Sequence, residues 1–284
     1  MEISQLIKEL RNKTGAGFLD CKTALSENNN NVDESVEYLR KKGLAKASKK
    51  TSREANEGAI GIYSNENCIS IIKVNSETDF AAKSDTFLNF LDDLGKIAIN
   101  NNKIDLTKEE FLNLKNDKGL ISDYFNTMIS TIGENLVLNE IIMLNNNNLN
   151  YSYYVHNSYK NNIGKIISTI QYSASDNNDE VKILSKNICM HIAAMKPESM
   201  DISDLDENII ANEKKIQREL ILNSGKPSSI VEKILEGKMS KFFSEITLLN
   251  QKYILDPEKT VKEVINEYEK TYNYKIDSFK LLSM

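Results

Sequence analysis

The spacing of hydrophobic residues changes from a helical to a strand-like period after the first fifty residues. Residues 3–10 carry apolar side chains at helical spacing, and Gly15 follows as a natural stop, which predicts a first helix. Two further short helices are expected over residues 18–25 and 32–39, the last ended by Gly43. We therefore predict a three-helix module that has little core of its own.

Beyond this module the pattern becomes that of strands. The runs 58–63 and 68–74 are rich in β-branched residues and are separated by a polar turn, which predicts a β-hairpin. A helix capped near Ser84 follows, then a helix over about 119–131 and an extended segment over 136–144. Strands at 151–156 and 163–172 and a helix over 179–195 repeat this order. A duplicated α+β core is the prediction.

The remaining residues break the repeat. A capping sequence at 203–206 predicts a helix to about Leu222, and Ser229 with Glu232 forms a second capping box that opens another helix. The two helices would form a protruding antiparallel hairpin. Asp256-Pro257-Glu258 is expected to cap a last helix, before a strand-like run to Leu282.

Four parts are therefore expected. They are a module and basic linker at 1–54, a first core subdomain at 55–145, a second core subdomain at 146–202 plus 250–284, and the hairpin at 203–249.

Composition excludes several protein classes. The net charge of −5 argues against a surface built throughout to neutralise phosphates, and nothing approaches the run of apolar residues that a membrane span needs. Three widely spaced cysteines without a C-x-x-C pair are typical of reduced thiols. With no leader-like segment at the N-terminus, we expect a cytoplasmic protein.

One short segment nevertheless concentrates positive charge. Residues 40–53 contain seven basic side chains and no acidic one. A contact with RNA or an acidic partner is one interpretation, and a solvated helix end and linker is the other, which is the commoner role of such runs.

Catalytic chemistry finds little support. The chain has no phosphate-binding glycine loop of the common types and no G-x-S-x-G motif. Cys189 and His191 lie two positions apart, so on a helix they point about 200° from each other and cannot converge on one metal ion. A buried thiol and a helix-lodged histidine are the simpler interpretation. We expect no catalytic residue, no metal site and no cofactor.

The segment Thr78-Asp79-Phe80 stands out because it places a phenylalanine in a strand-to-helix loop. In one interpretation Thr78 or Asp79 caps a turn and Phe80 packs onto the following helix. In the other, the acid and the aromatic ring form a probe for a pocket of a partner protein. The residues alone leave the two interpretations even.

Several ordered motifs resemble the translation elongation factor Ts family over nearly the whole chain. They are Leu6 to Leu25, Thr78-Asp79-Phe80-Ala81-Ala82-Lys83, Ile132-Gly133-Glu134-Asn135, His191 to Ala194 with Lys196-Pro197, and Ser224-Gly225-Lys226-Pro227. The resemblance implies a nucleotide-exchange factor, without covalent chemistry, for the GTPase elongation factor Tu in its GDP-bound and nucleotide-free forms. It also implies that the N-terminal module is of the ubiquitin-associated type.

The resemblance also assigns contact residues. The loop would enter the GTPase beside its magnesium ion through Asp79 and Phe80, flanked by Thr78 and Ala81. Ile132, Gly133 and His156 would grip the partner from the core. The N-terminal module would bind a helix of the same GTPase domain through the residues around its first turn: Arg11, Thr14, Gly15, Ala16, Gly17, Asp20, Cys21 and Lys22.

Three departures from the family pattern qualify this assignment. The polar stretch 157–162 after His156 is longer than the family's loop, Glu77 stands where a neutral residue is common, and a C-terminal helix found in some relatives looks absent. An RNA-binding or scaffold protein that uses residues 40–53 and the hairpin is the alternative. Direct nucleic-acid or membrane binding is not expected, and a homodimer or a 2:2 complex stays open.

Overall fold

The computed structural model describes residues 2–116, 119–145, 149–224 and 227–284 and combines helices with β-sheet, which confirms the α+β class. The chain divides into two compact units. The first comprises residues 1–145, 157–165 and 283–284, and the second comprises residues 146–156 and 166–282.

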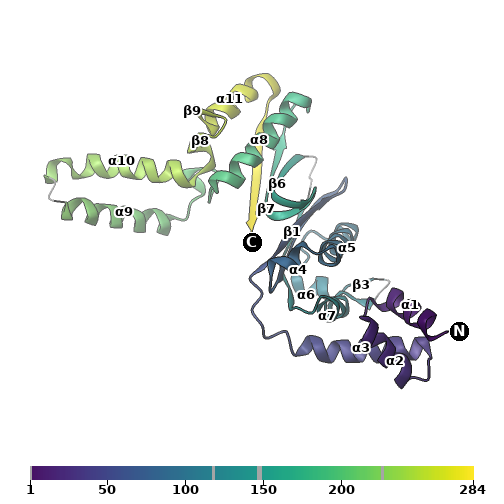
Figure 1. Ribbon diagram of the computed structural model, residues 1–284. Helices are drawn as coiled ribbons and strands as arrows, with labels where there is room; N and C mark the ends of the chain where they lie inside the picture. The colour runs from purple at the N-terminus through teal and green to yellow at the C-terminus, as the bar shows by residue number, and fades with distance from the viewer. Residues whose placement is uncertain (1, 117–118, 146–148, 225–226) are drawn as a thin grey trace. The chain divides into compact units, whose positions relative to one another are not determined.

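The first unit begins with three helices, α1 (Ile3–Thr14), α2 (Phe18–Glu27) and α3 (Val32–Ser48), seen in Figure 1. Gly15 ends α1 in the left-handed conformation with a φ of 67°, as predicted. The helices enclose a small core of their own, formed by Ile7, Leu10, Cys21, Ala24, Leu25 and Leu39.

The predicted end of the third helix at Gly43 is wrong, because α3 continues to Ser48. Gly43 is buried where α3 meets α7 (Ile121–Ile132), and a Cβ atom there would lie 3.4 Å from the Ser130 Oγ. The glycine therefore serves close helix packing and not termination.

A β-hairpin and a third strand form the sheet of this unit. β1 (Glu57–Ser64) pairs antiparallel with β2 (Cys68–Ser76), as predicted, and β2 pairs antiparallel with β5 (Leu136–Asn145). The side chain of Asn65 closes the turn by accepting hydrogen bonds from the amides of Asn67 and Cys68, at 2.8 and 2.9 Å. The first residues of β7 (Ile163–Ser173) add to the other side of β1.

Two long helices, α5 (Asp85–Asn101) and α7, cover this sheet. Ser84 caps α5 as predicted, accepting a hydrogen bond from the Phe87 amide. The Phe90 ring packs edge-on against Tyr124 and Phe125, with both centroid distances 4.8 Å. Edge-to-face aromatic pairs at this spacing stabilise the core of the unit beyond the burial of their surface.

The segment between α5 and α7 contains elements that the sequence pattern did not predict. They are the short helix α6 (Lys108–Leu112) and the two-residue strands β3 (Lys115–Asn116) and β4 (Gly119–Leu120). Thr107 and Glu110 form a capping box at the start of α6, a signal that was present in the sequence.

In the second unit β7 lies between β6 (Asn150–Lys160) and β10 (Lys275–Ser283). Apart from the strands, the helices α8 (Asp179–Met195) and α11 (Val261–Tyr272) supply most of the side chains in the core of this unit. The predicted bounds of α8 are confirmed.

The polar stretch after His156 was expected to be a loop, but the residues up to Lys160 continue β6. Asn157 takes a left-handed φ of 50°, which asparagine tolerates, and within the first unit the Lys160 ammonium lies 2.7 Å from the Asp92 carboxylate. Polar composition here indicates ion pairing and not an absence of structure.

The helices α9 (Glu207–Asn223) and α10 (Ser228–Ile246) lie side by side (Figure 1). They pack on each other through Ile221, Val231, Leu235 and Met239. Asp206 caps α9. The predicted capping box at Ser229 depends on a side chain that lies outside the described residues. The helix α10 begins at Ser228 behind Pro227, and Glu232 pairs with Arg218 at 2.9 Å. Gly225, Lys226 and the side chains of Ser228 and Ser229 lie outside the described residues.

The predicted last helix starts later than expected. The turns η1 (Ile202–Asp204) and η2 (Leu248–Asn250) flank the α9–α10 pair, and Asp256 and Pro257 belong to β9 (Asp256–Thr260), which pairs with β8 (Lys252–Tyr253). Thr260 and Glu263 form the capping box that opens α11. A reciprocal cap at this position satisfies two amides, whereas Pro257 only limits the backbone conformation.

Within the described residues no helix is both long enough and apolar enough to cross a membrane.

Candidate functional site

Thr78 begins a helix of a single turn, α4 (Asp79–Lys83). Its hydroxyl oxygen accepts a hydrogen bond from the Ala81 amide at 3.2 Å, so the predicted cap is confirmed. One turn later, the Lys83 ammonium lies 2.6 Å from the Asp79 carboxylate. The hydrogen bond from Lys83 lowers the pKa of Asp79, and the same contact raises the pKa of Lys83.

Phe80 is 82% exposed, the largest exposed fraction among the large apolar residues of the described chain. It does not pack onto the following helix, so that half of the simpler interpretation is wrong. Ala81 and Ala82 are buried on the other side of α4, and their small side chains let the turn sit close to β1 and β2. The helix is held to the core by alanines, and this leaves the ring outside.

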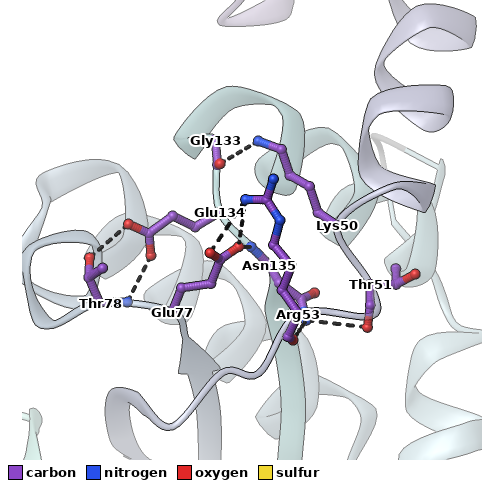
Figure 2. A network of polar contacts seen from close by, with 8 residues as sticks. All are labelled: Lys50, Thr51, Arg53, Glu77, Thr78, Gly133, Glu134 and Asn135. Carbon is purple, nitrogen blue, oxygen red and sulfur yellow. Dashed lines mark hydrogen bonds and ion pairs between the residues drawn. The ribbon is translucent and has the colours of Figure 1, made fainter.

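Glu134 holds the start of α4 (Figure 2). It follows Gly133, which ends α7 with a φ of 88°, and its carboxylate accepts from the Thr78 amide at 2.9 Å and from the Thr78 hydroxyl at 2.7 Å. Because the hydroxyl hydrogen points to Glu134, the hydroxyl lone pairs remain available to cap Ala81.

Glu77 makes the reciprocal contact, with the residue that follows Glu134. Its carboxylate accepts from the Asn135 amide at 2.6 Å, and the Arg53 guanidinium lies 3.4 Å from the same oxygen. The Asn135 side-chain amide donates to the Arg53 carbonyl at 2.8 Å, and Lys50 donates to the Gly133 carbonyl. Two turns that are far apart in the sequence are therefore joined by polar contacts at both ends (Figure 2).

The basic segment 40–53 forms the end of α3 and the linker after it, as the simpler interpretation expects, and most of its described basic side chains are exposed, but several of them are paired. Besides Lys50 and Arg53, Arg40 pairs with Asp123 at 2.6 Å and Lys42 with Asp20 at 3.4 Å. Lys41 and Lys49 are exposed, and the Lys46 side chain lies outside the described residues. Several of these charges thus attach the three helices to the rest of the unit, which leaves fewer of them for phosphates.

The residues assigned to the N-terminal module surround the turn between α1 and α2. Arg11, Gly17 and Lys22 are exposed, whereas the Thr14 hydroxyl donates to the Leu10 carbonyl at 2.6 Å and Ala16 is half-buried. Cys21 is buried and its thiol contacts the Ala16 carbonyl.

Phe18 and Leu19 are 53% and 76% exposed at the start of α2. The sequence pattern placed them among the apolar positions of this helix, together with Ala24 and Leu25, and not among the contact residues. Their position immediately after the glycine turn, ahead of the buried Cys21, was the available signal. Two adjacent apolar side chains in this position are typical of a contact surface.

Of the residues assigned to the core, Ile132 and Gly133 are half-buried at the end of α7, directly before Glu134. His156 is exposed on β6 in the second unit, where its Nδ1 lies 3.2 Å from the Tyr154 hydroxyl.

Cys189 and His191 are fully buried, as the simpler interpretation predicted. The thiol donates to the Ser152 carbonyl at 3.3 Å, and burial raises its pKa to about 12. The His191 Nδ1 accepts from the Ile254 amide at 3.3 Å, so Nε2 carries the proton and donates to the Gln251 oxygen at 2.9 Å. Burial lowers the pKa of His191. In the described part of the chain no three His, Cys, Asp or Glu side chains gather in a metal-binding group.

Known proteins resemble this chain throughout. The family model "Elongation factor TS" matches residues 77–284, a stretch that begins at the glutamate before Thr78. Elongation factor Ts of Rickettsia prowazekii (strain Madrid E) is 39% identical over 279 residues, which cover 98% of this chain and 89% of the relative. Elongation factor Ts of Syntrophotalea carbinolica is 37% identical over 268 residues, or 94% of this chain and 87% of the relative. The motifs, the fold and these matches agree, and the chain belongs to the elongation factor Ts family.

Proposed function

We propose that this protein is a guanine-nucleotide exchange factor that binds elongation factor Tu, both with GDP and without nucleotide, and promotes the release of GDP. The observation that supports this best is the Phe80 ring, which is 82% exposed on a helix braced from two sides. An exposed aromatic residue on a rigid support is typical of an interface hot spot.

The proposed mechanism acts on the magnesium site of the partner. Mg²⁺ requires a nearly octahedral set of ligands, and the phosphates of GDP lie among backbone amides. Phe80 inserted beside that site shifts its ligands, while the Asp79 carboxylate disfavours the anionic nucleotide. Because coupling between two ligands is reciprocal, a factor that weakens GDP binding is itself bound more weakly in the presence of GDP. No covalent bond is made or broken, and the factor requires no cofactor of its own.

Further contacts are proposed on both units. In the first, Thr78 and Ala81 flank the probe, Ile132 and Gly133 lie near it in the α7–β5 turn, and the helical module binds the same GTPase domain around Arg11 to Lys22. The exposed Phe18 and Leu19 support this last surface. In the second unit the proposed contact is His156.

We propose the same four domains that the sequence suggests. A ubiquitin-associated-like module with its linker occupies residues 1–54, the two core subdomains occupy 55–145 and 146–202 plus 250–284, and a protruding hairpin occupies 203–249. The separate small core of α1 to α3 and the packing of α9 on α10 support these boundaries. A cytoplasmic location is proposed from the family's role in translation.

The deciding experiment measures release of fluorescently labelled GDP from elongation factor Tu of the same organism. The full chain is expected to accelerate release in proportion to its concentration, up to saturation. Absence of acceleration, despite binding detected by ultracentrifugation, would overturn the proposal. If the protein instead binds RNA, and its affinity for RNA falls steeply as the salt concentration rises, the nucleic-acid alternative is favoured.

A further inference from the structure

Two glutamates beside the probe bind each other's turns. Glu77 and Glu134 each precede a residue whose backbone amide is held by the other carboxylate: Glu134 accepts from Thr78 at 2.9 Å, and Glu77 accepts from Asn135 at 2.6 Å. We refer to Glu77 and Glu134 as the crossed carboxylates. Hydrogen bonds to a charged acceptor are stronger than neutral ones, so each contact restricts its turn effectively.

The helix α4, which carries Phe80, is too short to be stable by itself and depends on contacts with its surroundings. A helix of five residues is far too short to persist without outside support. Its support comes from buried Ala81 and Ala82 on one side and from Glu134 at the cap. The Ser76 hydroxyl adds a bond to the Thr78 carbonyl at 2.9 Å. The exposed ring of Phe80 is oriented by its backbone and not by packing of its own side chain.

We infer that Glu134, with Glu77 as its reciprocal partner, is a positioning residue that fixes the direction in which Phe80 leaves α4 before the GTPase is met. This inference rests on the proposed function. Glu134 acts through Thr78 and need not touch the partner. A probe that is ordered in advance does not have to be ordered during binding, which lowers the cost of the productive encounter.

The test first uses the free protein. The chain contains no tryptophan, so Phe80→Trp places a single tryptophan at the probe, which can be excited at a wavelength that the tyrosines of the chain do not absorb. Time-resolved anisotropy of this variant reports the amplitude of its fast local motion. We expect Glu134→Ala to raise that amplitude about twofold and Glu134→Gln, which retains one acceptor oxygen, to raise it less. Glu109→Ala removes an exposed glutamate of α6 and is expected to leave the amplitude unchanged. An unchanged amplitude in Glu134→Ala would overturn the inference.

The second arm measures GDP release with Phe80 in place. Loss of the two bonds from Thr78 to Glu134 is expected to reduce the second-order rate constant of catalysed release about tenfold in Glu134→Ala. A smaller loss is expected in Glu134→Gln, and none in Glu109→Ala. Equal rates for Glu134→Ala and the unmodified protein would contradict the inference.

The two hypotheses fail separately. If the anisotropy responds to Glu134 while release does not respond to Phe80→Ala, the crossed carboxylates position the residue but the proposed function is wrong. If Phe80→Ala slows release while the anisotropy ignores Glu134, only the positioning inference fails. If Glu134→Ala does not fold, Glu77→Gln and Glu134→Gln replace it, because each keeps the size of the side chain and removes its charge. Both are expected to raise the anisotropy amplitude and to slow release relative to Glu109→Ala.

Discussion

Two clusters of hydrogen-bonded polar side chains each join segments distant in the sequence, but one lies beside an exposed aromatic ring and the other is fully buried. In the first unit, the crossed carboxylates join the turns at Thr78 and Asn135, beside a phenylalanine that is 82% exposed. In the second unit, His191 and Gln251 join α8 to the segment after α10 and are both fully buried. Each cluster ties together segments that are far apart in the sequence.

The difference shows that the chemical type of a residue does not by itself indicate a functional site. Histidine and cysteine are common in active sites, yet here their polar atoms already have partners within the protein and no access to a substrate. Phenylalanine has no reactive group, but its ring is left without a partner surface of its own. We therefore expect the cluster of His191 and Gln251 to contribute to stability, and the crossed carboxylates beside Phe80 to contribute to function.

The largest expected effect concerns the exposed ring. Phe80→Ala should slow catalysed GDP release on the order of 100-fold, or about 3 kcal/mol, because a hot-spot side chain is lost. Its unfolding temperature should not change, since the ring contributes little to the core. Leu255→Ala removes a 55% exposed apolar side chain from the second unit and serves as the control. Similar release rates for both variants would remove the functional half of the comparison.

Gln251→Ala should show the reverse behaviour. Gln251 bonds to the His191 ring at 2.9 Å and donates to the Glu245 carbonyl at 2.7 Å, so its loss leaves buried polar groups without partners. We expect chemical denaturation to give a free energy of unfolding lower by about 2–3 kcal/mol, with GDP release by the folded protein unchanged. Gln217→Ala, in the half-buried surface of α9, should cost less than about 1 kcal/mol.

The buried histidine also predicts a pH dependence. Burial lowers the pKa of His191 below its ordinary value of about 6.5, so the unfolded chain takes up the proton first as pH falls. Stability from this group is complete above about pH 6.5 and is lost below it, by up to about 1.4 kcal/mol per pH unit. His191→Gln should flatten this part of the stability curve measured between pH 5 and 8. Curves that stay parallel would show that His191 is not the group responsible.

The smallest effect is expected at the ion pair beside the probe. The Lys83 and Asp79 side chains are largely in solvent, where such pairs contribute little. Lys83→Met should therefore change the rate of GDP release by less than about twofold at moderate salt. A larger change would mean that neutralisation of Asp79, and not only the ring, controls the first cluster. Titration of the rate against ionic strength distinguishes the two.

Local signals in the sequence predicted much of the fold. Ser84 caps α5, Gly15 ends α1, and the apolar spacing of residues 179–195 gives the bounds of α8, because caps and periodicity act within a few residues. The errors came from positions where a local signal competed with packing or with a stronger cap. Gly43 packs against α7 instead of ending α3, and Thr260 opens α11 where Pro257 seemed to.

The candidate site shows the same division. The order of the longer helices and strands, a cap at Thr78 or Asp79 and the motifs shared with the family could be read from the residues alone. The folded arrangement was needed to show that Phe80 is exposed, that His191 is buried, and that Glu134 bonds to Thr78 across 56 positions of sequence. The physical reason is that exposure and long-range hydrogen bonds depend on which surfaces meet after folding. A short stretch of sequence does not specify which distant segments of the chain come into contact.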